Sequence, residues 1–504
     1  MKWTVHRHNS LPKLAWLAEC SSRSVSLEVG RAVEVGADWI FEGAWSGPFR
    51  EQQFGTAATV SGSGTELKGD SVLFVSPSHT LEALFYHLAN ERLLVSNSLA
   101  FLIEALGAQV RYDPRIAKRL ASAVLGVRDY QTHVLNTDKG GISRLLYCNM
   151  RWVPGGGLEF ERKPDPFAFR SYQDYRETLS SELGALFANA ADQGRTRHYA
   201  PVSTCSSGYD STACLVLASE FGCSRAVTLD TARSEVDDSG THIAEHLGIS
   251  VQNFPRREIG RREEVEEFVA TGMGGEDVIF AAFEPAIGDS VLLTGFHGDK
   301  IWGKGVKPNS VLARGDVSGS NFAEFRLRTG FIHVPVPFIG ALHHPELAAI
   351  SNSRNMSQWS VGGWYDRPIP RRIAEDAGVP RNAFGSEKKA ASQLLFLAPE
   401  VQPSAFTDAA RAEVAALPFS SRLSASIRER MFKPRLSVVR LLDRAQKLSS
   451  PAKEFARLLR DIVGGDPRLL EHDKPSASFE FLAALAAIRK RYSVEVANRS
   501  CEIS

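Results

Sequence analysis

Residues 202–213 read VSTCSSGYDSTA, and this stretch decides how the middle of the chain folds. A short, mildly apolar strand enters a loop of serines and one glycine, and a helix is expected to leave it over residues 212–218. Successive backbone N–H groups and a helix N-terminus then point at one spot, which suits a polyanion. The stretch is not a Walker loop, because no GKS or GKT sequence follows it.

The side chains of this loop indicate how a polyphosphate would be held. Ser206, Ser207 and Ser211 add hydroxyl donors, and Gly208 lets the backbone approach phosphates closely. Asp210 would repel a phosphate directly, but it suits a Mg²⁺ ion that bridges phosphates. A plain Ser/Gly turn before a helix remains the alternative interpretation of the loop taken alone.

Strand-like and helix-like segments alternate on the C-terminal side of the loop. Ala226–Leu229 and Ser250–Phe254 are typical of strands, and Thr241–Leu247 between them is typical of a helix. This alternation predicts an α/β fold with a parallel, doubly wound sheet. After about Pro337 the pattern is mainly helical.

The first 160 or so residues have the pattern of a β-rich domain, with short apolar segments between Gly/Ser clusters. One helix is expected over Leu99–Leu106, with Ser98 as its N-cap and Gly107 as its stop. We therefore expect three units in the chain. They are a β-rich domain at 1–165, a doubly wound domain at 166–400, and a helical, locally basic extension at 401–504.

Composition excludes several classes of function. The 504 residues suffice for two domains, and 59 Lys plus Arg balance 58 Asp plus Glu, so we expect no nucleic-acid and no membrane partner. Six cysteines show no CxxC pair and no metal-ligand spacing, which favours reduced thiols. No signal peptide and no run of roughly 18 apolar residues is present, so we expect a cytoplasmic protein.

The loop and several later segments resemble one family. SSGYDS at 206–211 is similar to the SGGxDS pyrophosphate loop of the N-type ATP pyrophosphatases, with Ser207 where the first Gly is usual. Residues 291–303, VLLTGFHGDKIWG, resemble the SGxGxDExFGG element of asparagine synthetases, and residues 334–338 resemble their RVPF segment. Residues 367–389 resemble the stretch that closes their active site with a lysine.

The first domain resembles class II glutaminases in its layout at residues 72–75, 94–99 and 142–156. This resemblance implies an Ntn-type αββα domain. Lys2 follows Met1, so the cysteine nucleophile of these glutaminases is missing, and glutamine hydrolysis is expected to be absent. Cys20 is expected to be a core cysteine. The domain is thus interpreted as a degenerate glutaminase.

The resemblance to asparagine synthetases, β-lactam synthetases and lasso-peptide cyclases implies an ATP-dependent amide ligase. In these enzymes a carboxylate attacks the α-phosphorus of ATP, pyrophosphate leaves, and an amine opens the acyl-adenylate. The resemblance implies that Asp210 and Asp299 hold Mg²⁺. It also implies that Lys388, with Lys389 as the fallback, meets the charge developing during acyl transfer. The residues implied to bind ATP and pyrophosphate are Ser206, Ser207, Gly208, Tyr209, Asp210, Ser211 and Gly295.

Two positions near Asp299 depart from the family pattern. Lys300 stands where the family usually has Glu, and a cation there cannot act as a base or as a second metal ligand. His297 replaces a Gly and is either polar lining or a proton acceptor for the amine. These changes affect the reaction with the amine more than the binding of ATP.

Several reactions remain open within the resemblance. The carboxylate is a small molecule or a peptide, and the enzyme is a lasso-type macrolactam cyclase, another natural-product amide synthetase, or an ammonia-dependent amidotransferase. A nucleic-acid thiolase normally needs paired catalytic cysteines, which are missing. Lys300 and Ser207 keep an ATP-binding pseudoenzyme open.

A basic segment lies near the C-terminus. Residues 422–460 contain eleven Lys or Arg against three acids, although the whole chain is nearly neutral. Such a segment is either a solvated helix face or a docking patch for a precursor peptide or another acidic partner.

Overall fold

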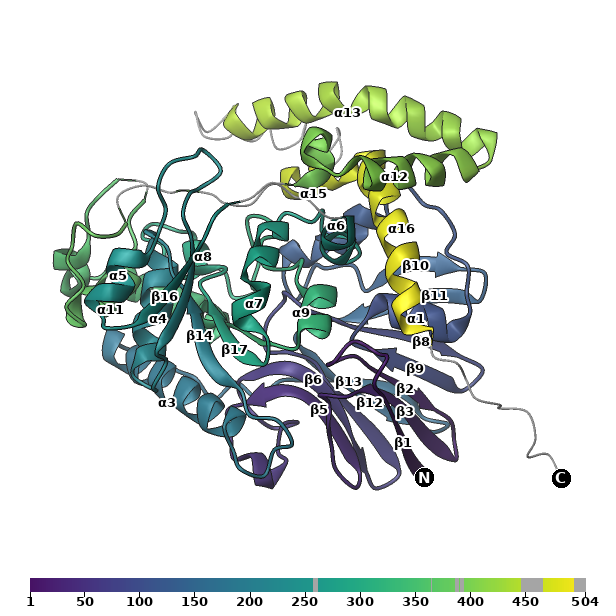
Figure 1. Cartoon of the computed structure of the whole chain (residues 1–504), viewed down its shortest axis with the longest axis horizontal. Coiled ribbons are helices and arrows are strands. Elements are labelled where there is room, and N and C mark those ends of the chain that lie inside the picture. The colour runs from purple at the N-terminus through teal and green to yellow at the C-terminus, as the bar shows by residue number, and fades with distance from the viewer. Residues whose placement is uncertain (257–261, 364, 386–388, 390–393, 446–465, 494–504) are drawn as a thin grey trace.

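The computed structural model describes residues 1–504 apart from 257–261, 364, 386–388, 390–393, 446–465 and 494–504. The chain has a mixed α/β fold (Figure 1). Residues 1–162 form two sheets in which most neighbouring strands are antiparallel, and residues 200–335 supply a parallel sheet. The predicted combination of a β-rich first part with a parallel α/β part is therefore confirmed.

The first N-terminal sheet has seven strands in the order β1-β3-β2-β9-β8-β11-β10. β1 pairs with β3 in parallel, and the neighbouring pairs that follow in this order are antiparallel. Its strands are β1 (Lys2–His8), β2 (Trp16–Cys20), β3 (Ser24–Gly30), β8 (Leu84–Ala89), β9 (Arg92–Ser96), β10 (His133–Thr137) and β11 (Gly140–Leu145).

The second N-terminal sheet has six strands in the order β13-β12-β7-β6-β5-β4, with antiparallel neighbours. Its strands are β4 (Glu34–Val35), β5 (Trp39–Trp45), β6 (Val60–Lys68), β7 (Ser71–Val75), β12 (Cys148–Val153) and β13 (Gly157–Arg162). The strands β12 and β13 form a hairpin around the predicted turn, where Val153 pairs with Gly157.

Side-chain alternation along the strands packs these two sheets face to face. In β7, Val72 and Phe74 point into the shared core, where the Phe74 ring stacks on Trp16 of the other sheet. Their neighbours Leu73 and Val75 point to the opposite face and meet a cluster of aromatic residues. Helices α1 (Leu99–Leu106) and α2 (Ile116–Ala121) pack on the outer face of the seven-stranded sheet.

Helix α1 was fully predictable, because its start and stop signals are local. The Ser98 hydroxyl accepts a hydrogen bond from the backbone N–H of Phe101, which satisfies a donor that the first turn leaves open. Gly107 adopts a left-handed conformation with φ 57°, which ends the helix.

The parallel sheet has the order β16-β15-β14-β17-β18. Its strands are β14 (Ala200–Thr204), β15 (Arg225–Leu229), β16 (Ser250–Phe254), β17 (Ser290–Thr294) and β18 (Ile332–Pro335), and all neighbours are parallel. The first strand, β14, lies in the centre, and the chain winds outward from it in one direction and then in the other. A topological switch point therefore lies between the carboxyl ends of β14 and β17, where ligands bind in open α/β sheets.

Helices cover both faces of this sheet, as a doubly wound sheet requires. Helices α3 (Tyr172–Ala190) and α4 (Tyr209–Ser219) pack on one face, and α6 (Arg262–Val269) and α9 (Ala323–Thr329) pack on the other. In β17, Leu293 faces the first pair of helices and Leu292 faces the second. Helix α4 begins three residues earlier than predicted, directly after Gly208.

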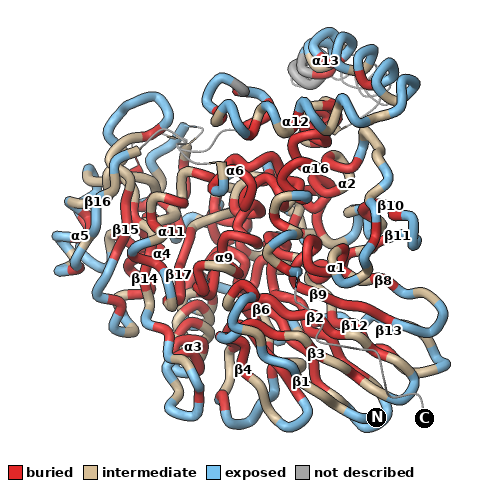
Figure 2. Tube along the Cα trace, turned by 45° about the vertical axis from the view of Figure 1, so that its right-hand side comes forward, coloured by how far each residue is buried: buried red, intermediate tan, exposed pale blue. Residues whose placement is uncertain are grey.

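The C-terminal part is mainly helical, as predicted, and contains α10 (His344–Asn352), α11 (Pro368–Asp376), α12 (Ser404–Ala416), α13 (Phe419–Ala445) and α16 (Pro475–Arg489). Helix α16 packs against α12, α6 and α1, so it joins the N-terminal sheets to the parallel-sheet part. Helix α13 runs along the outside and is largely exposed (Figure 2). Among the described residues, no helix is long and apolar enough to cross a membrane.

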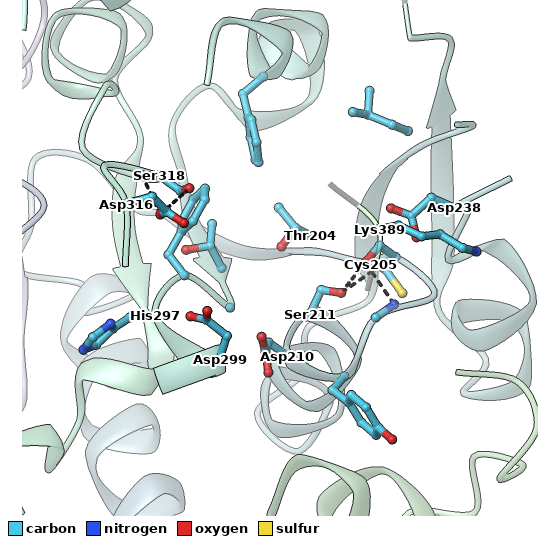
Figure 3. A pocket seen from close by; sticks show the side chains of 18 of the residues that line it. Thr204, Cys205, Asp210, Ser211, Asp238, His297, Asp299, Asp316, Ser318 and Lys389 are labelled. Atoms are coloured by element: carbon cyan, nitrogen blue, oxygen red, sulfur yellow. Dashed lines mark hydrogen bonds between the residues drawn. The ribbon is translucent and has the colours of Figure 1, made fainter. Parts of the chain in front are cut away.

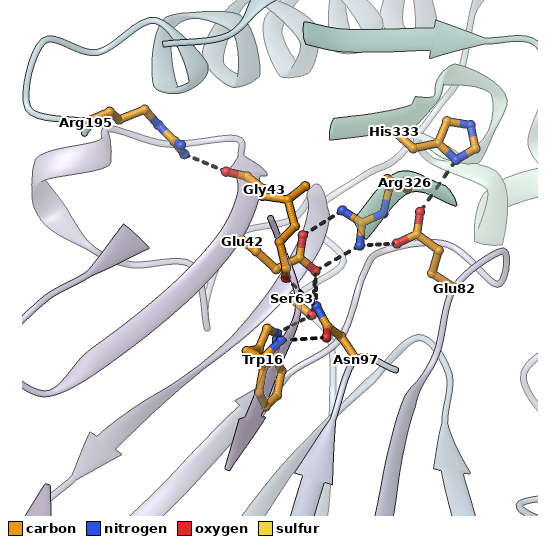
Figure 4. A network of polar contacts seen from close by, with 10 residues as sticks. Trp16, Glu42, Gly43, Ser63, Glu82, Asn97, Arg195, Arg326 and His333 are labelled. Carbon is orange, nitrogen blue, oxygen red and sulfur yellow. Dashed lines mark hydrogen bonds and ion pairs between the residues drawn. The ribbon is translucent and has the colours of Figure 1, made fainter. Parts of the chain in front are cut away.

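A buried network of charges joins the N-terminal sheets to the parallel-sheet part (Figure 4). Arg326 of α9 donates to both carboxylate oxygens of Glu42 in β5 at 2.7 and 3.0 Å, and it forms an ion pair with Glu82 at 2.9 Å. Burial works against the charge of Glu82, but Arg326 and His333 outweigh this effect and lower its pKa to about 2. The two parts are therefore held together by a specific ionic contact as well as by apolar packing.

Candidate functional site

A cavity of about 420 Å³ opens at the switch point between β14 and β17 (Figure 3). Most of the residues predicted to form a site line this cavity. They are Ser206, Gly208, Tyr209, Asp210, Ser211, Gly295, His297, Asp299 and Lys389. Lys388 lies outside the described residues, so its predicted role stays a prediction.

The loop after β14 is held in shape by its own serines. The hydroxyls of Ser206 and Ser211 lie 2.8 Å apart, and the N–H of Ser206 donates to Ser211 Oγ at 3.1 Å. The N–H of Gly208 donates to Ser206 Oγ at 3.2 Å, and the Thr212 hydroxyl donates to the Gly208 carbonyl at 2.7 Å. The loop thus delivers the N-terminus of the eleven-residue helix α4 to the cavity, which favours a bound anion.

Ser207, the departure from the usual glycine, fastens this loop to its neighbours. Its hydroxyl donates to the Asp238 carboxylate at 2.7 Å and accepts from Lys389 Nζ at 3.0 Å. Lys389 Nζ also donates to the Asp237 carbonyl at 2.6 Å. Burial raises the pKa of Asp238, and the hydrogen bond from Ser207 opposes that shift. Ser207 and Lys389 therefore act on the position of the loop.

Asp210 and Asp299 come from the two loops at the switch point and lie next to each other in the middle of the cavity (Figure 3). Their approach depends on two glycines. A Cβ on Gly295 would lie 2.6 Å from Asp210 Cβ, and a Cβ on Gly298 would lie 2.5 Å from Asp210 Cγ. Gly298 was not among the predicted site residues, although its place directly before Asp299 in the sequence was a usable signal.

This pair of carboxylates fits Mg²⁺, which binds one or two protein carboxylates and takes its remaining ligands from phosphates and water. Gly295 and Gly298 let the loop that carries Asp299 lie directly against Asp210, because a Cβ on either glycine would overlap the Asp210 side chain. No group of three or more potential metal-ligating side chains exists in the described part of the chain. A metal here would therefore share its coordination with a ligand, as Mg²⁺ does with a nucleotide.

Arg367 brings a positive charge to the same place, although it was not among the predicted site residues. Its guanidinium donates to Asp210 Oδ2 and lies over the Tyr365 ring at 4.9 Å. Burial opposes its charge, but the Asp210 carboxylate more than offsets this and raises the pKa of Arg367. The site therefore contains a permanent cation next to the carboxylates.

Tyr209 has a structural part in the site. Its hydroxyl accepts a hydrogen bond from Arg371 at 2.7 Å, and its ring packs against Gly385, where a Cβ would lie 2.4 Å from the ring. The side chain is fully buried. Tyr209 thus anchors the first turn of α4 to helix α11.

His297 lines the cavity, but its ring points away from Asp210 and Asp299 (Figure 3). The ring stacks on Phe338 at 4.9 Å, and neither ring nitrogen has a hydrogen-bond partner among the described residues. Burial lowers its pKa to about 3, so the ring is neutral at physiological pH. Its backbone has φ 76°, a left-handed conformation that favours glycine.

Lys300 lies beside Asp299, with Nζ 3.7 Å from Asp299 Oδ2. Its side chain is 40% exposed, and it passes over Gly315, where a Cβ would lie 2.9 Å from Lys300 Cε. The ammonium group of Lys300 therefore lies at the rim of the site.

Apolar side chains and acidic groups complete the cavity. Val227 and Leu229 at the end of β15, with Phe280 and Phe283, form an apolar wall. Glu276, Arg314, Asp316 and Ser318 form a polar wall that the sequence interpretation missed. These residues come from segments with no recognisable motif, so no signal pointed to them.

Cys20 and Cys205 are both poorly suited to act as nucleophiles. Cys20 is fully buried in the core between the N-terminal sheets, as predicted, and burial raises its pKa far above the usual range. Cys205 lines the cavity, but burial raises its pKa to about 12, so its thiol stays protonated. A thiolate is needed for nucleophilic attack.

Similarity to known proteins adds nothing to this geometry. No model of a known protein family matches the sequence, and no curated protein matches it either.

Proposed function

We propose that this chain is an ATP-dependent ligase of the asparagine synthetase type. It would adenylate a carboxylate, release pyrophosphate and pass the acyl group to an amine. One observation carries the proposal, namely that a serine-rich loop and a glycine-rich loop converge at the switch point with Asp210 and Asp299 side by side. A plain Ser/Gly turn would not need a second loop with its own carboxylate.

The shape of the cavity suggests how ATP binds. The Ser206–Ser211 loop and the N-terminus of α4 would hold the phosphates. The apolar wall around Val227 and Leu229 suits a purine ring, since nucleotide sites combine apolar walls with a few polar groups. Bound Mg²⁺, held by Asp210 and Asp299, would neutralise charge on the phosphates.

The chain's own cations would then favour departure of pyrophosphate. Arg367 keeps its charge next to Asp210 and would stabilise negative charge on the leaving group. Lys389 would keep the phosphate loop in position through Ser207. Lys388, by its resemblance to the lysine of the synthetases, would meet the charge of the acyl transfer.

We propose a degenerate, Ntn-type glutaminase-like domain for the N-terminal part, on the strength of its two facing sheets. The burial of Cys20, which raises the pKa of its thiol, supports the proposal that this domain does not hydrolyse glutamine. The amine is therefore proposed to come from the substrate or from ammonia. A peptide substrate, as in a macrolactam cyclase, agrees with the exposed apolar residues Phe419, Leu423 and Ile427 on the basic helix α13.

A second candidate, an ATP-binding pseudoenzyme, is favoured by Lys300. Its ammonium lies next to Asp299, in the position where the synthetases have a carboxylate. Such a protein would bind MgATP without cleaving it.

The test is ATP–pyrophosphate exchange with a panel of amino acids and peptides as carboxylates. Asp210→Asn should abolish exchange and leave the circular dichroism spectrum unchanged, because the substitution is isosteric. Asp408→Asn, at an exposed position on α12, is the matched control and should keep full exchange. Exchange in Asp210→Asn equal to that of the wild type would overturn the proposal, and MgATP binding without any exchange would establish the pseudoenzyme.

A further inference from the structure

We propose that the outer face of helix α13 is a docking surface for an amphipathic helix of an acidic partner protein. Six exposed apolar side chains form this surface, which we call the α13 stripe: Phe419, Leu423, Ile427, Met431, Val438 and Leu441. None of the described residues that line the cavity belongs to α13. A helix bound to the stripe has no part in the cavity, so the partner is a separate protein rather than the reacting substrate. The proposal does not depend on the ligase activity.

Helix α13 is fixed to the rest of the chain by its inner face. Ala425, Phe432 and Val439 follow one another at intervals of seven residues and are at most 7% exposed. Seven residues make almost two helical turns, so these side chains lie on one line along the helix. The helix contacts α15 (Pro467–Leu470) and α16, and Arg435 forms an ion pair with Asp473 at 2.6 Å. The inner face thus already has its partners.

The α13 stripe lies on the other side of the helix and is open to solvent (Figure 2). Successive residues of an α-helix are turned by about 100°, which places the six side chains within about 120° of one another and roughly opposite Phe432. Each of the six is between 43% and 73% exposed. A helix that is apolar all round is normally buried, and an exposed apolar patch marks an interaction site. The stripe therefore favours a docking surface over the solvated helix face that was the alternative interpretation of this segment.

The charges of the outer face are positive. Arg422, Arg430 and Lys433 are exposed and form no ion pair with any residue that the structure describes. Glu429 does not offset them, because its carboxylate lies 3.6 Å from Lys474 Nζ. The outer face therefore offers cations without partners to whatever covers the stripe.

Arg430 specifies the chemistry of the partner. It follows Leu423 by seven residues and precedes Leu441 by eleven, intervals that place it in the stripe itself. Covering the stripe takes its guanidinium out of water, and a buried charge is costly unless it is paired. A carboxylate opposite Arg430 removes this cost, and further acids can pair with Arg422 and Lys433 at the edge of the stripe. The partner helix is therefore acidic as well as apolar.

Two other occupants fit the stripe less well. In a second copy of this chain the same cations would meet on facing helices, and like charges repel. A membrane surface would have to take in the stripe together with Arg430, whereas helices that lie in a membrane interface carry their cations on the polar face. In α13 the face opposite the stripe is packed against the protein. An acidic helix is thus the occupant that matches both the apolar side chains and the charges.

The length of the stripe sets the size of the partner segment. Phe419 and Leu441 are 22 positions apart, which at 1.5 Å per residue is about 33 Å. A partner helix of about six turns would lie along the stripe, with apolar residues at i, i+3, i+4 and i+7 facing it. Asp and Glu residues would flank these positions.

The test uses two 22-residue probe peptides that are designed to be helical and carry a fluorescein label. Both have leucines at i, i+3, i+4 and i+7, and their other positions are mainly Glu in one peptide and mainly Lys in the other. Binding to the full-length protein is measured by fluorescence anisotropy without nucleotide. The Glu peptide should bind about tenfold or more tightly than the Lys peptide, and its affinity should fall as the salt concentration rises.

Two substitutions separate the apolar part of the surface from the ionic part. Ile427→Ser and Arg430→Glu should each weaken binding of the Glu peptide by about tenfold or more, and Arg430→Glu should also strengthen binding of the Lys peptide. Both positions are exposed, so the circular dichroism spectrum should not change. The matched controls are Leu88→Ser, at an exposed apolar position of β8, and Arg170→Glu, at an exposed cation before α3. Both controls should keep the affinity of the wild type.

Equal or undetectable binding of the two peptides, or Glu-peptide binding that survives either substitution, would overturn the proposal. Sedimentation of the protein with phosphatidylserine vesicles that Ile427→Ser abolishes would assign the stripe to a membrane instead. A dimer in analytical ultracentrifugation that Ile427→Ser dissociates would assign it to a second copy of the chain. A change in the mass of the Glu peptide after incubation with MgATP would make the peptide a substrate. Glu-peptide binding combined with absent ATP–pyrophosphate exchange would support the docking surface and contradict only the ligase.

Discussion

The backbone of Gly298 lies directly against the carboxylate of Asp210, so that a Cβ on Gly298 would be 2.5 Å from Asp210 Cγ. The two residues belong to different loops, one after β14 and one after β17. The loops can approach each other only because no side chain stands between them. This contact sets the position of Asp210 relative to Asp299.

Gly298→Ala should therefore disable the site. Gly298 has no left-handed backbone, so alanine is tolerated locally, but its methyl group must push Asp210 aside. A shift of about 1 Å in a positioned group costs about 10²-fold in rate, and ATP–pyrophosphate exchange should fall by that factor. The control is Gly288→Ala, whose Cβ would meet the Thr329 carbonyl at an ordinary 3.7 Å. A Gly298→Ala variant with full exchange would show that the loops can separate without loss.

The two lysines at 388 and 389 should differ in which kinetic constant they control. Lys389 is hydrogen-bonded to Ser207, so Lys389→Ala should loosen the Ser206–Ser211 loop and mainly raise KM for ATP. Lys388→Ala should lower kcat by roughly 10²–10³-fold with little change in KM, because a cation that meets charge only in the transition state contributes to turnover. Steady-state kinetics of both single variants and the double variant distinguish the roles. The reverse pattern would assign the catalytic role to Lys389.

Arg326 should be among the most important residues for stability. Arg326→Met would leave Glu42 and Glu82 buried without their cation, and breaking a buried ion pair costs about 3–5 kcal/mol. The urea midpoint of unfolding measures this loss. Arg411→Met is the control, because Arg411 and its partner Asp408 are exposed, and surface substitutions stay within about 0.5 kcal/mol. A midpoint that Arg326→Met leaves unchanged would mean that the network does not hold the two parts together.

Local signals explain how much of the fold was predictable. Residues 250–254 form β16 as expected, and α1 has the predicted cap and stop, because each depends on neighbours in the sequence. The packing of α16 against α1 was not predictable, since it joins segments more than 300 residues apart. The expected C-terminal extension therefore contains a helix that belongs to the common core.

The residues of the candidate site also fall into two groups, those that local sequence signals indicated and those that only the fold brings to the cavity. Asp210 and Asp299 follow strands in recognisable loops, so the sequence indicated both. Arg367 reaches Asp210 across 157 positions, and only the fold brings them together. Glu276 belongs to no recognisable motif, and only the fold shows that it lies, largely buried, in the cavity wall.

The most direct test of the central claim is to identify the bond of ATP that the protein cleaves. The protein is incubated with MgATP labelled in the adenine ring, a panel of amino acids and peptides as carboxylates, and hydroxylamine as the amine. Nucleotide products are separated by chromatography. The account predicts AMP and pyrophosphate in amounts equal to the hydroxamate formed, and neither product with Asp210→Asn. Formation of ADP and phosphate would contradict adenylation and would assign the cavity to phosphoryl transfer.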